Sequence, residues 1–536
     1  MATKKNASLK SQDLTPPDGG LAVRMYRHGL GDCFLLAFAR TPPAKPCYVL
    51  IDCGVHMRQK NGATRLGEVM KDVAEVTGGN IDIVVATHEH ADHLSGFVQT
   101  DGPFAQGKVE VDRFWAAWTE KLDDGQAKRL RARRGAARKV IQAAVKKLKE
   151  RSDTGLAECL TGLMDFETMP AAAPTTAGAA KTAKASSNEV ALELLRQRAH
   201  NVEYCEPGAV LKLPGVTEAR AYVLGPPRDE VLLKRDTPRK GPGKETYLTA
   251  RAQQQTFLVA PPFGETLTAE ELDRDFRHPF ESAVRRKYHF ANGPTPRWGR
   301  DGLVSKGTRS FCNAHYFKAD SLWRRIDTDW LGAAEQLALD LDSDTNNTSL
   351  VLAFEVGPVG QGDVLLFVGD AQVGNWLSWR SQRYRVGART CSADDLLART
   401  VLYKVGHHGS HNATIRRDPL HSSPQNPQGE PFGLELMPSR LIAMIPVDQD
   451  AVRKPMPKPW LMPHVPLYRR LLERADGRVL RSDGRPPSDV GVQLEAHSPG
   501  TTLARVPGLA NVQWRESDAV FKAGSDPLYY DIVFKP

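Results

Sequence analysis

The chain has 536 residues, and its 72 Lys and Arg against 63 Asp and Glu give a net charge of +9. Hydrophobic residues make up 41% and charged residues 25%, which is typical of globular proteins and excludes wholesale disorder. The sequence has no run near the roughly 18 apolar residues of a membrane helix, no apolar signal region, and no Cys-x-x-Cys pair among its seven cysteines. We therefore expect a cytoplasmic protein with reduced cysteines and no membrane partner.

The N-terminal part of the chain predicts strands whose ends carry polar residues. Residues 1–20 are expected to form a disordered tail, and 21–54 a β-hairpin region whose last strand ends at Asp52. After a helical stretch over 63–76, an apolar strand over 81–86 runs directly into the polar sequence THEHADH. Because open α/β sheets commonly build their sites at strand ends, this polar cluster is the first candidate site.

Residues 120–151 are unusually basic, with twelve basic residues, four acidic residues and a net charge of +8. The few apolar positions predict a helix with a narrow buried stripe. Its charge is interpreted either as a solvated helix face or as a surface that contacts phosphates. The Ala, Thr, Ser and Pro residues that dominate 170–188 predict a flexible linker.

The second half of the chain returns to strands after a long segment without clean periodicity. A strand over 219–227 is closed by Gly-Pro-Pro, and the charged, Trp- and Arg-rich residues 230–340 are expected to be an insertion of mixed structure. Further strands are expected over 349–356, 363–370, 400–406 and 441–447, and a β-like tail from about residue 498.

The sequence THEHADH offers four potential metal ligands within six residues: His88, His90, Asp92 and His93. Placed after a buried strand, these imidazoles and carboxylates would cost folding energy unless a cation satisfied them. The spacing suits two metals, because His88 and His90 can share one ion while Asp92 and His93 serve a second ion beside it. The sequence therefore predicts a site for two divalent cations.

This pattern resembles that of the metallo-β-lactamase fold superfamily, whose signature is His-x-His-x-Asp-His after a strand. The resemblance implies an α/β fold, an αββα sandwich, here with two large insertions. It also implies that Asp52 orients the metal loop, that Asp370 in LLFVGD bridges both metals, and that His407 in YKVGHHGS is the last histidine ligand. The implied ligand set is His88, His90, Asp92, His93, Asp370 and His407.

The variants Gly-Asp and His-His-Gly-Ser resemble one branch, which contains the metallo-β-lactamase domain of competence DNA-uptake channel proteins. Gly31-Asp32, the LGPP sequence at 224–227, and the supporting residues Asn346 and Ser349 in NNTSLVL also match that branch. The superfamily usually has a further histidine ligand between the first cluster and the bridging aspartate, and that ligand is often missing in this branch. The candidates by position are His200, His278, His289 and His315, none of which ends a convincing strand.

Zinc is the expected metal, since imidazole and carboxylate ligands suit it. Manganese is the alternative if the first ion has open positions and hard oxygen ligands. The candidate catalytic residues are Asp92, as a ligand of the reacting centre, and His408, as a general acid beside the presumed ligand His407.

The leading hypothesis is a phosphodiesterase or nuclease that cleaves nucleic acid by metal-activated water, because the basic segment and the branch resemblance both favour a phosphate-rich polymer. One alternative is a small-molecule hydrolase whose insertions form a lid. Another is a defence- or toxin-type component whose insertions bind a protein partner. The residues expected to contact nucleic acid are Lys128, Arg129, Arg131, Arg133, Arg134, Arg138 and Lys139.

The expected domain organisation is one core interrupted by two insertions. The core comprises 21–100, a strand within 219–229, and 341–497. The insertions are a basic helical segment over 101–218 and a second segment over 230–340. Residues 498–536 are expected to form a β-like C-terminal extension.

Overall fold

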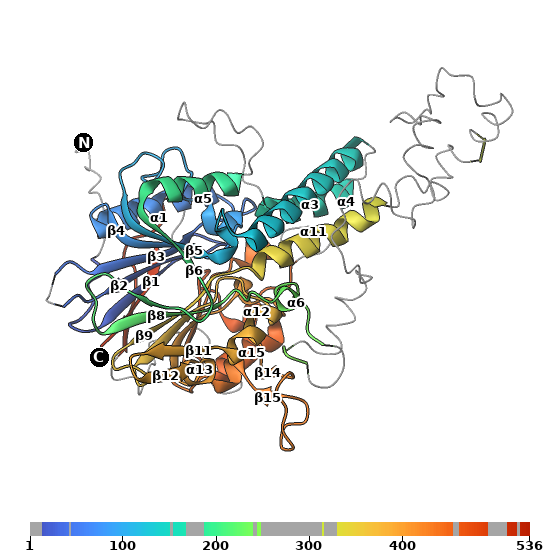
Figure 1. Cartoon of the computed structure of the whole chain (residues 1–536). Helices are drawn as coiled ribbons and strands as arrows, with labels where there is room; N and C mark the ends of the chain where they lie inside the picture. The colour runs from blue at the N-terminus through green and yellow to red at the C-terminus, as the bar shows by residue number, and fades with distance from the viewer. Residues whose placement is uncertain are drawn as a thin grey trace, which may run out of the picture.

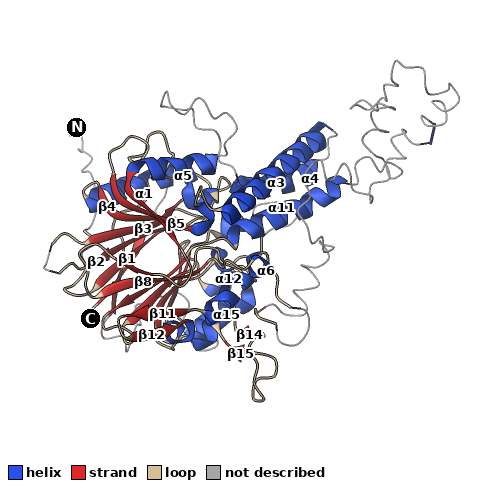
Figure 2. Ribbon diagram, in the orientation of Figure 1, coloured by secondary structure: helices blue, strands red, loops and turns tan. Residues whose placement is uncertain are grey.

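The computed structural model describes residues 13–41, 44–150, 154–167, 187–239, 244–247, 314–315, 330–453, 460–490, 492, 512–522 and 526–535. Two mixed β-sheets pack face to face, and helices cover their outer faces, so the chain has the predicted αββα architecture (Figure 2). None of the helices in these ranges combines the length and apolar character that a membrane crossing requires.

The first sheet has eight strands and is built mainly from the N-terminal part of the chain. The neighbouring strands from β3 to β6 run parallel, and the remaining pairs are antiparallel. In spatial order the strands are β18 (Val512–Glu516), β19 (Tyr529–Phe534), β1 (Leu21–Tyr26), β2 (Cys33–Phe38), β3 (Cys47–Cys53), β4 (Asn80–Ala86), β5 (Glu110–Ala117) and β6 (Ala199–Cys205).

The second sheet has seven strands and comes mainly from the C-terminal half. Strands β10, β13, β16 and β17 are parallel neighbours. In spatial order the strands are β17 (Val479–Arg481), β16 (Ile442–Ile445), β13 (Thr400–Lys404), β10 (Asp363–Phe367), β9 (Val351–Val356), β8 (Ala219–Gly225) and β7 (Val210–Lys212). The strands expected over 349–356, 363–370, 400–406 and 441–447 all lie in this sheet.

Side chains from the inner faces of both sheets form one continuous apolar core. Phe34 of β2 meets Phe367 of β10 edge to face, with ring centroids 5.5 Å apart. On the outer face of the first sheet, α1 (Gly62–Thr77) buries Leu66, Val69 and Val73, which recur at the spacing of one helix face. Helix α1 ends at Gly78, whose left-handed φ of 62° suits glycine.

Helix α5 (Ser187–Arg198) also packs on the first sheet. The second sheet is covered by α12 (Val373–Ser378), α13 (Ala393–Leu397) and α15 (Val465–Arg474). The shorter elements are α2 (Ala91–Leu94), α6 (Glu230–Leu233), α14 (Gln449–Arg453) and the two-stranded sheets β11 (Arg383–Val386) with β12 (Arg389–Ser392) and β14 (Arg417–Asp418) with β15 (Glu430–Pro431).

Three helices form a bundle that projects from the sandwich, and we call this bundle the helical arm (Figure 1). Its members are α3 (Gly125–Glu150), α4 (Thr154–Glu167) and α11 (Trp330–Asn346). They share a small apolar core that includes Ile141 of α3, Leu160 of α4 and Leu341 of α11. The basic segment of the sequence is therefore a helix with a narrow buried stripe, and both insertions contribute to one arm.

Two predicted boundaries are wrong. Within the expected insertion 101–218, β5 and β6 extend the first sheet, α5 packs on it and β7 extends the second sheet, so the described residues that leave the sandwich lie between β5 and α5. The expected C-terminal extension includes β18 and β19, and β19 pairs with β1 inside the first sheet. Some predicted segments lie outside the described residues. They are most of the expected N-terminal tail over 1–20, almost all of the 170–188 linker, most of 230–340 and the first part of the expected C-terminal extension over 498–536.

The pairing of β19 with β1 is reinforced by a buried ion pair. Arg24 on β1 donates to Asp531 on β19 at 2.8 Å and to Asp72 on α1 at 2.7 Å. The guanidinium of Arg24 also stacks on the ring of Tyr529, 3.4 Å from its centroid. A buried arginine needs such partners, since an unpaired buried charge is costly.

Candidate metal centre

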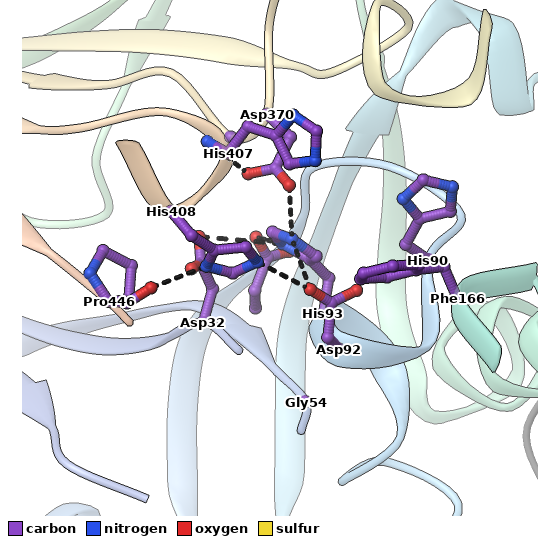
Figure 3. A network of polar contacts seen from close by, with 12 residues as sticks. Asp32, Gly54, His90, Asp92, His93, Phe166, Asp370, His407, His408 and Pro446 are labelled. Atoms are coloured by element: carbon purple, nitrogen blue, oxygen red, sulfur yellow. Dashed lines mark hydrogen bonds and ion pairs between the residues drawn. The ribbon is translucent and has the colours of Figure 1, made fainter. Parts of the chain in front are cut away.

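The candidate metal centre lies where four strands of the two sheets end (Figure 3). Asp52 is the last residue but one of β3, and β4 leads through Thr87 into the loop and short helix α2 that carry the His-x-His-x-Asp-His residues. From the second sheet, β10 leads to Asp370 and β13 leads to the two adjacent histidines. Their convergence at one edge follows from the parallel pairing of β3 with β4 and of β10 with β13.

The end of β3 approaches the metal loop closely. Gly54 lies so near Asp92 that a Cβ atom on it would fall 2.3 Å from the Asp92 carbonyl carbon. Asp52, in the left-handed region with φ 53°, accepts hydrogen bonds from the Thr87 amide at 2.8 Å and the Thr87 hydroxyl at 2.7 Å. Its Oδ2 also lies 2.8 Å from His93 Nδ1. Asp52 thus holds the loop and fixes one imidazole, as the resemblance implies.

His88 and His90 each turn one ring nitrogen toward the other, and in the neutral form of both rings these two nitrogens carry lone pairs. The Thr87 hydroxyl donates to Asp52, so it accepts from His88 Nδ1 at 3.0 Å, which leaves the lone pair on His88 Nε2. His90 Nε2 donates to the Glu167 carboxylate at 2.9 Å, which leaves the lone pair on His90 Nδ1. These two lone-pair nitrogens are 3.1 Å apart. Two nitrogens bound to one tetrahedral Zn²⁺ would be about 3.3 Å apart, so this pair, the first cation position, fits a metal.

A second group, Asp92, His93, Asp370 and His408, has ligand atoms that all lie within 4.8 Å of one another. The Pro446 carbonyl can only accept, so His408 donates to it through Nδ1 at 2.6 Å. His408 Nε2 lies 2.9 Å from Asp92 Oδ2, and although burial opposes protonation, this hydrogen bond and the nearby carboxylates raise the pKa of His408. His93, which donates through Nδ1 to Asp52, similarly turns Nε2 toward Asp370 Oδ2 at 3.3 Å. We call this group the second cation position.

Unsatisfied buried atoms support the same assignment. Among the described residues, Asp92 Oδ1 and His93 Nε2 are buried without a hydrogen-bond partner. Burial opposes protonation of His93, but the surrounding carboxylates, Asp370 first, outweigh it and raise the pKa of His93 well above its usual value. Acceptors facing acceptors in a buried site need a cation between them, and a divalent metal suits this donor set of imidazoles and carboxylates.

Asp370 is held on several sides. Lys404 Nζ lies 3.3 Å from Asp370 Oδ1, the His407 amide donates to the same oxygen at 3.0 Å, and Ser349 Oγ accepts from the Asp370 amide at 2.9 Å. Burial raises the pKa of the Asp370 carboxyl, but His93 and Lys404 oppose this and bring the pKa well below its usual value. Its Oδ2 stays directed at His93, the orientation that a shared ligand needs.

The structure places His408, rather than His407, in the second cation position, contrary to the predicted ligand set. The chain turns sharply there, because His407 and His408 both have left-handed φ angles of 45° and 53°. The His407 ring instead lies beside Asp370, and its Nδ1 is 3.1 Å from the Ser410 hydroxyl (Figure 3). Burial lowers the pKa of His407 to about 4.

The structure brings no further histidine from the described residues to His88 and His90. His200 is exposed on β6 beside Glu110 and Asp112, and His315 joins no ligand group, whereas His278 and His289 lie outside the described residues. Asn346 donates to Asp342 at 3.1 Å, and its own Oδ1 is buried without a partner. Among the described residues the first cation position is thus made of two imidazoles, and Asp342, the partner of Asn346, has Oδ1 3.8 Å from His90 Nε2.

The predicted nucleic-acid contacts fall into two groups. Arg134 and Arg138 are buried among carboxylates, so their prediction as phosphate contacts is wrong. Arg131 donates to the carbonyl oxygens of Thr119 and Lys121. Lys128, Arg129 and Lys139 are exposed, and Arg133 is partly buried.

Two site residues were missed by the sequence reasoning, Lys404 and Glu167. Lys404 is a buried cation that pairs with Asp32 and Asp370, and its position in the last apolar strand before the two histidines was the available signal. Glu167 comes from the arm, 77 residues after His90, and no local pattern marks it.

Comparison with known proteins agrees with this geometry. Two adjacent cation positions at the strand ends of an αββα sandwich define a class of metal-dependent hydrolases. A sequence model of the metallo-beta-lactamase superfamily matches residues 45–180, which include β3, β4 and the metal loop. A search of curated proteins found no significant match. Residues 45–180 are thus similar to the metallo-beta-lactamase superfamily, in agreement with the αββα fold. The resemblance to the competence-channel branch stays a prediction.

Proposed function

We propose that this metal-dependent hydrolase is a phosphodiesterase or nuclease that acts on nucleic acid. The observation that carries the proposal is the exposed basic surface of α3, formed by Lys128, Arg129 and Lys139, on an arm that also reaches the metal centre. Phosphate polymers bind such surfaces by releasing counterions. Two bound cations would suit the in-line displacement at a phosphodiester.

The residues that would hold the cations are His88 and His90 at the first position, and Asp92, His93 and His408 at the second, with Asp370 between the two. Bound divalent metals lower the pKa of a coordinated water and offset negative charge on a substrate oxygen. Asp52 keeps His93 in the required tautomer, and the Pro446 carbonyl does the same for His408. Lys404 and the His407 amide fix Asp370 through Oδ1. Zinc is the proposed metal, with manganese as the alternative.

The proton-transfer role predicted for His408 passes to His407 in this proposal. His408 is committed to Asp92 and Pro446 and is fully buried, whereas the His407 ring lies beside Asp370 and is 7% exposed. A group that exchanges a proton with a substrate must reach the substrate. An anionic phosphate bound beside His407 would raise its pKa from about 4 toward neutrality.

One observation favours the alternative, a small-molecule hydrolase with a closed site. His88, His90, Asp92, His93, Asp370 and His408 are all no more than 2% exposed. Phe166 of the arm lies over His90, with ring centroids 5.7 Å apart, so the arm covers part of the centre. A polymer would need the arm to move, whereas a small phosphodiester would not.

The test is hydrolysis of labelled single- and double-stranded DNA and RNA, and of a small chromogenic phosphodiester, by protein loaded with Zn²⁺ or Mn²⁺. Asp92→Asn is the inactive control. Cleavage of a polymer at a higher kcat/KM than the small ester supports the nuclease. Turnover of the small ester alone supports the alternative, and no metal-dependent hydrolysis of either substrate contradicts the phosphodiesterase proposal.

A further inference from the structure

The base of the helical arm is tied to the metal loop by a buried ionic network. Arg138 of α3 donates to Glu89, within the His-x-His loop, at 2.9 Å and to Glu167 of α4 at 2.8 Å. Thr345 of α11 donates to the same Glu167 at 3.1 Å. Two helices of the arm therefore each send a side chain to a carboxylate on the third, and that carboxylate contacts His90.

The contact between Glu167 and His90 decides which ring nitrogen of His90 is available. A carboxylate accepts only, so its 2.9 Å contact keeps a proton on His90 Nε2, and in the neutral ring the lone pair is then on Nδ1. Only Nδ1 faces His88, at 3.1 Å. With the proton on Nδ1, an N–H would point into the space where a cation must sit.

The network also explains why the carboxylate stays charged and in place. Glu167 is 1% exposed, and Arg138 supplies a second charge-assisted bond to its other oxygen. Removing the charge of Glu167 leaves Arg138 with Glu89 as its main partner, so the fold retains a buried ion pair. Glu167 can therefore be changed without leaving a bare buried cation.

We propose that Glu167, held by Arg138 and Thr345, is the positioning residue that orients His90 for metal binding, so that the helical arm completes the first cation position of the sandwich. The inference rests on the proposed metal-dependent function. It assigns the arm a role in building the centre, in addition to any role in binding substrate. The second cation position has no described contact with Glu167 and should be independent of it.

The direct test is Zn²⁺ binding by Glu167→Gln, measured by competition with a chromophoric chelator and by elemental analysis. An amide can donate as well as accept, so it does not fix the tautomer of His90. We expect the affinity of one of two equivalents to fall 10- to 100-fold, which is typical when a ligand's hydrogen-bond partner is lost. Asp165→Asn is the matched control, because Asp165 is on the same helix and pairs with Arg58 rather than with a histidine.

The melting temperature of each metal-free protein is the check on folding, and we expect both variants to stay close to the unmodified protein. Two equivalents bound by Glu167→Gln at unchanged affinity would overturn the inference. An equal loss of affinity in Asp165→Asn would also overturn it, since the effect would then be a general one of α4.

A measurement on the unmodified, metal-free protein covers the case in which Glu167→Gln does not fold. Long-range proton–nitrogen correlation spectra report the tautomer of His90, and a proton on Nε2 is expected. A proton on Nδ1 alone would contradict the role of Glu167. An unmodified protein that binds no Zn²⁺ or Mn²⁺ contradicts the proposed function itself, whereas the tautomer still tests the positioning contact.

Discussion

The two cation positions differ in what supports them. The second position depends on the sandwich alone, because His93 is fixed by Asp52 of β3 and His408 by the Pro446 carbonyl. The first position depends on the arm, because His90 is fixed by Glu167 of α4. A metal centre can thus combine ligands anchored by the shared fold with ligands anchored by an insertion. Such an insertion can alter one metal without disturbing the other.

The largest expected effect is on the residue between the two positions. Asp370→Asn removes the anionic oxygen directed at His93, so both cations should be weakened and hydrolysis should fall at least about 1,000-fold, which corresponds to about 4 kcal/mol. Metal content and turnover measure this. Asp363→Asn is the control, since Asp363 begins β10, the strand that leads to Asp370, and pairs with exposed Arg440. Full activity and two bound metals in Asp370→Asn would refute the assignment.

The buried ion pairs at the base of the helical arm can be tested by measuring the free energy of unfolding. Arg134 is 4% exposed and lies 3.2 Å from Glu120 and 3.7 Å from Glu89, so Arg134→Ala leaves buried carboxylates with fewer partners. We expect a loss of about 3–5 kcal/mol in the free energy of unfolding. Lys139→Ala, on the exposed face of the same helix, should change it by no more than about 0.5 kcal/mol. Denaturant melts of both variants measure this, and equal values would show that the network is not a support.

The second cation position can be tested by replacing each of the two adjacent histidines, His407 and His408. His408→Ala should lower the Zn²⁺ content by about one equivalent, because it removes a member of the second position. His407→Ala should keep both metals and lower turnover roughly 100-fold, the usual size of a lost proton transfer. Elemental analysis and kcat separate these outcomes. Loss of metal in His407→Ala with retention in His408→Ala would restore the ligand set predicted from the sequence.

The exposed face of the arm should affect neither cation position. Reversing Lys128, Arg129 and Lys139 to Glu should weaken nucleic-acid binding about 10- to 100-fold and flatten the slope of log K against log salt by up to about 2.7 for duplex DNA. Turnover of a small phosphodiester should stay unchanged. The control reverses three exposed arginines of the β11–β12 hairpin, Arg383, Arg385 and Arg389. An identical salt slope in both variants would remove the main support for a polymeric substrate.

The sequence was sufficient to predict the αββα sandwich and the strand ends that carry the candidate metal centre. Strands that end in polar residues, the His-x-His-x-Asp-His pattern and the Gly-Asp at Asp370 all carry local signals, and the structure confirms the αββα fold that they predict. Which of His407 and His408 joins the second cation position could not be predicted, because it depends on the backbone. Both residues have left-handed φ angles, and this turn directs the His408 side chain toward Asp92 and His93.

The contacts of the helical arm could not be predicted from the local sequence, for a different reason. A run of basic residues has the same appearance whether its members face solvent or buried carboxylates. Arg138 and Arg129 occur in one helix, yet the first is 5% exposed within the network while the second is exposed and pairs with Glu230 at 3.4 Å on the surface. Their difference depends on Glu89 and Glu167, which come from other segments. The apolar positions of this segment therefore predicted the helix, but its basic residues did not reveal which of them would be buried against carboxylates.

The pairing of β19 with β1 has a consequence for biosynthesis. Arg24 leaves the ribosome long before its partner Asp531, which lies 507 positions later in the chain. Until β19 arrives, one edge of β1 has no hydrogen-bonding neighbour there, and the Arg24 guanidinium lacks the carboxylate that it donates to twice. Translation products that stop short of β19 should therefore expose an unpaired, aggregation-prone sheet edge and be recognised by chaperones and proteases.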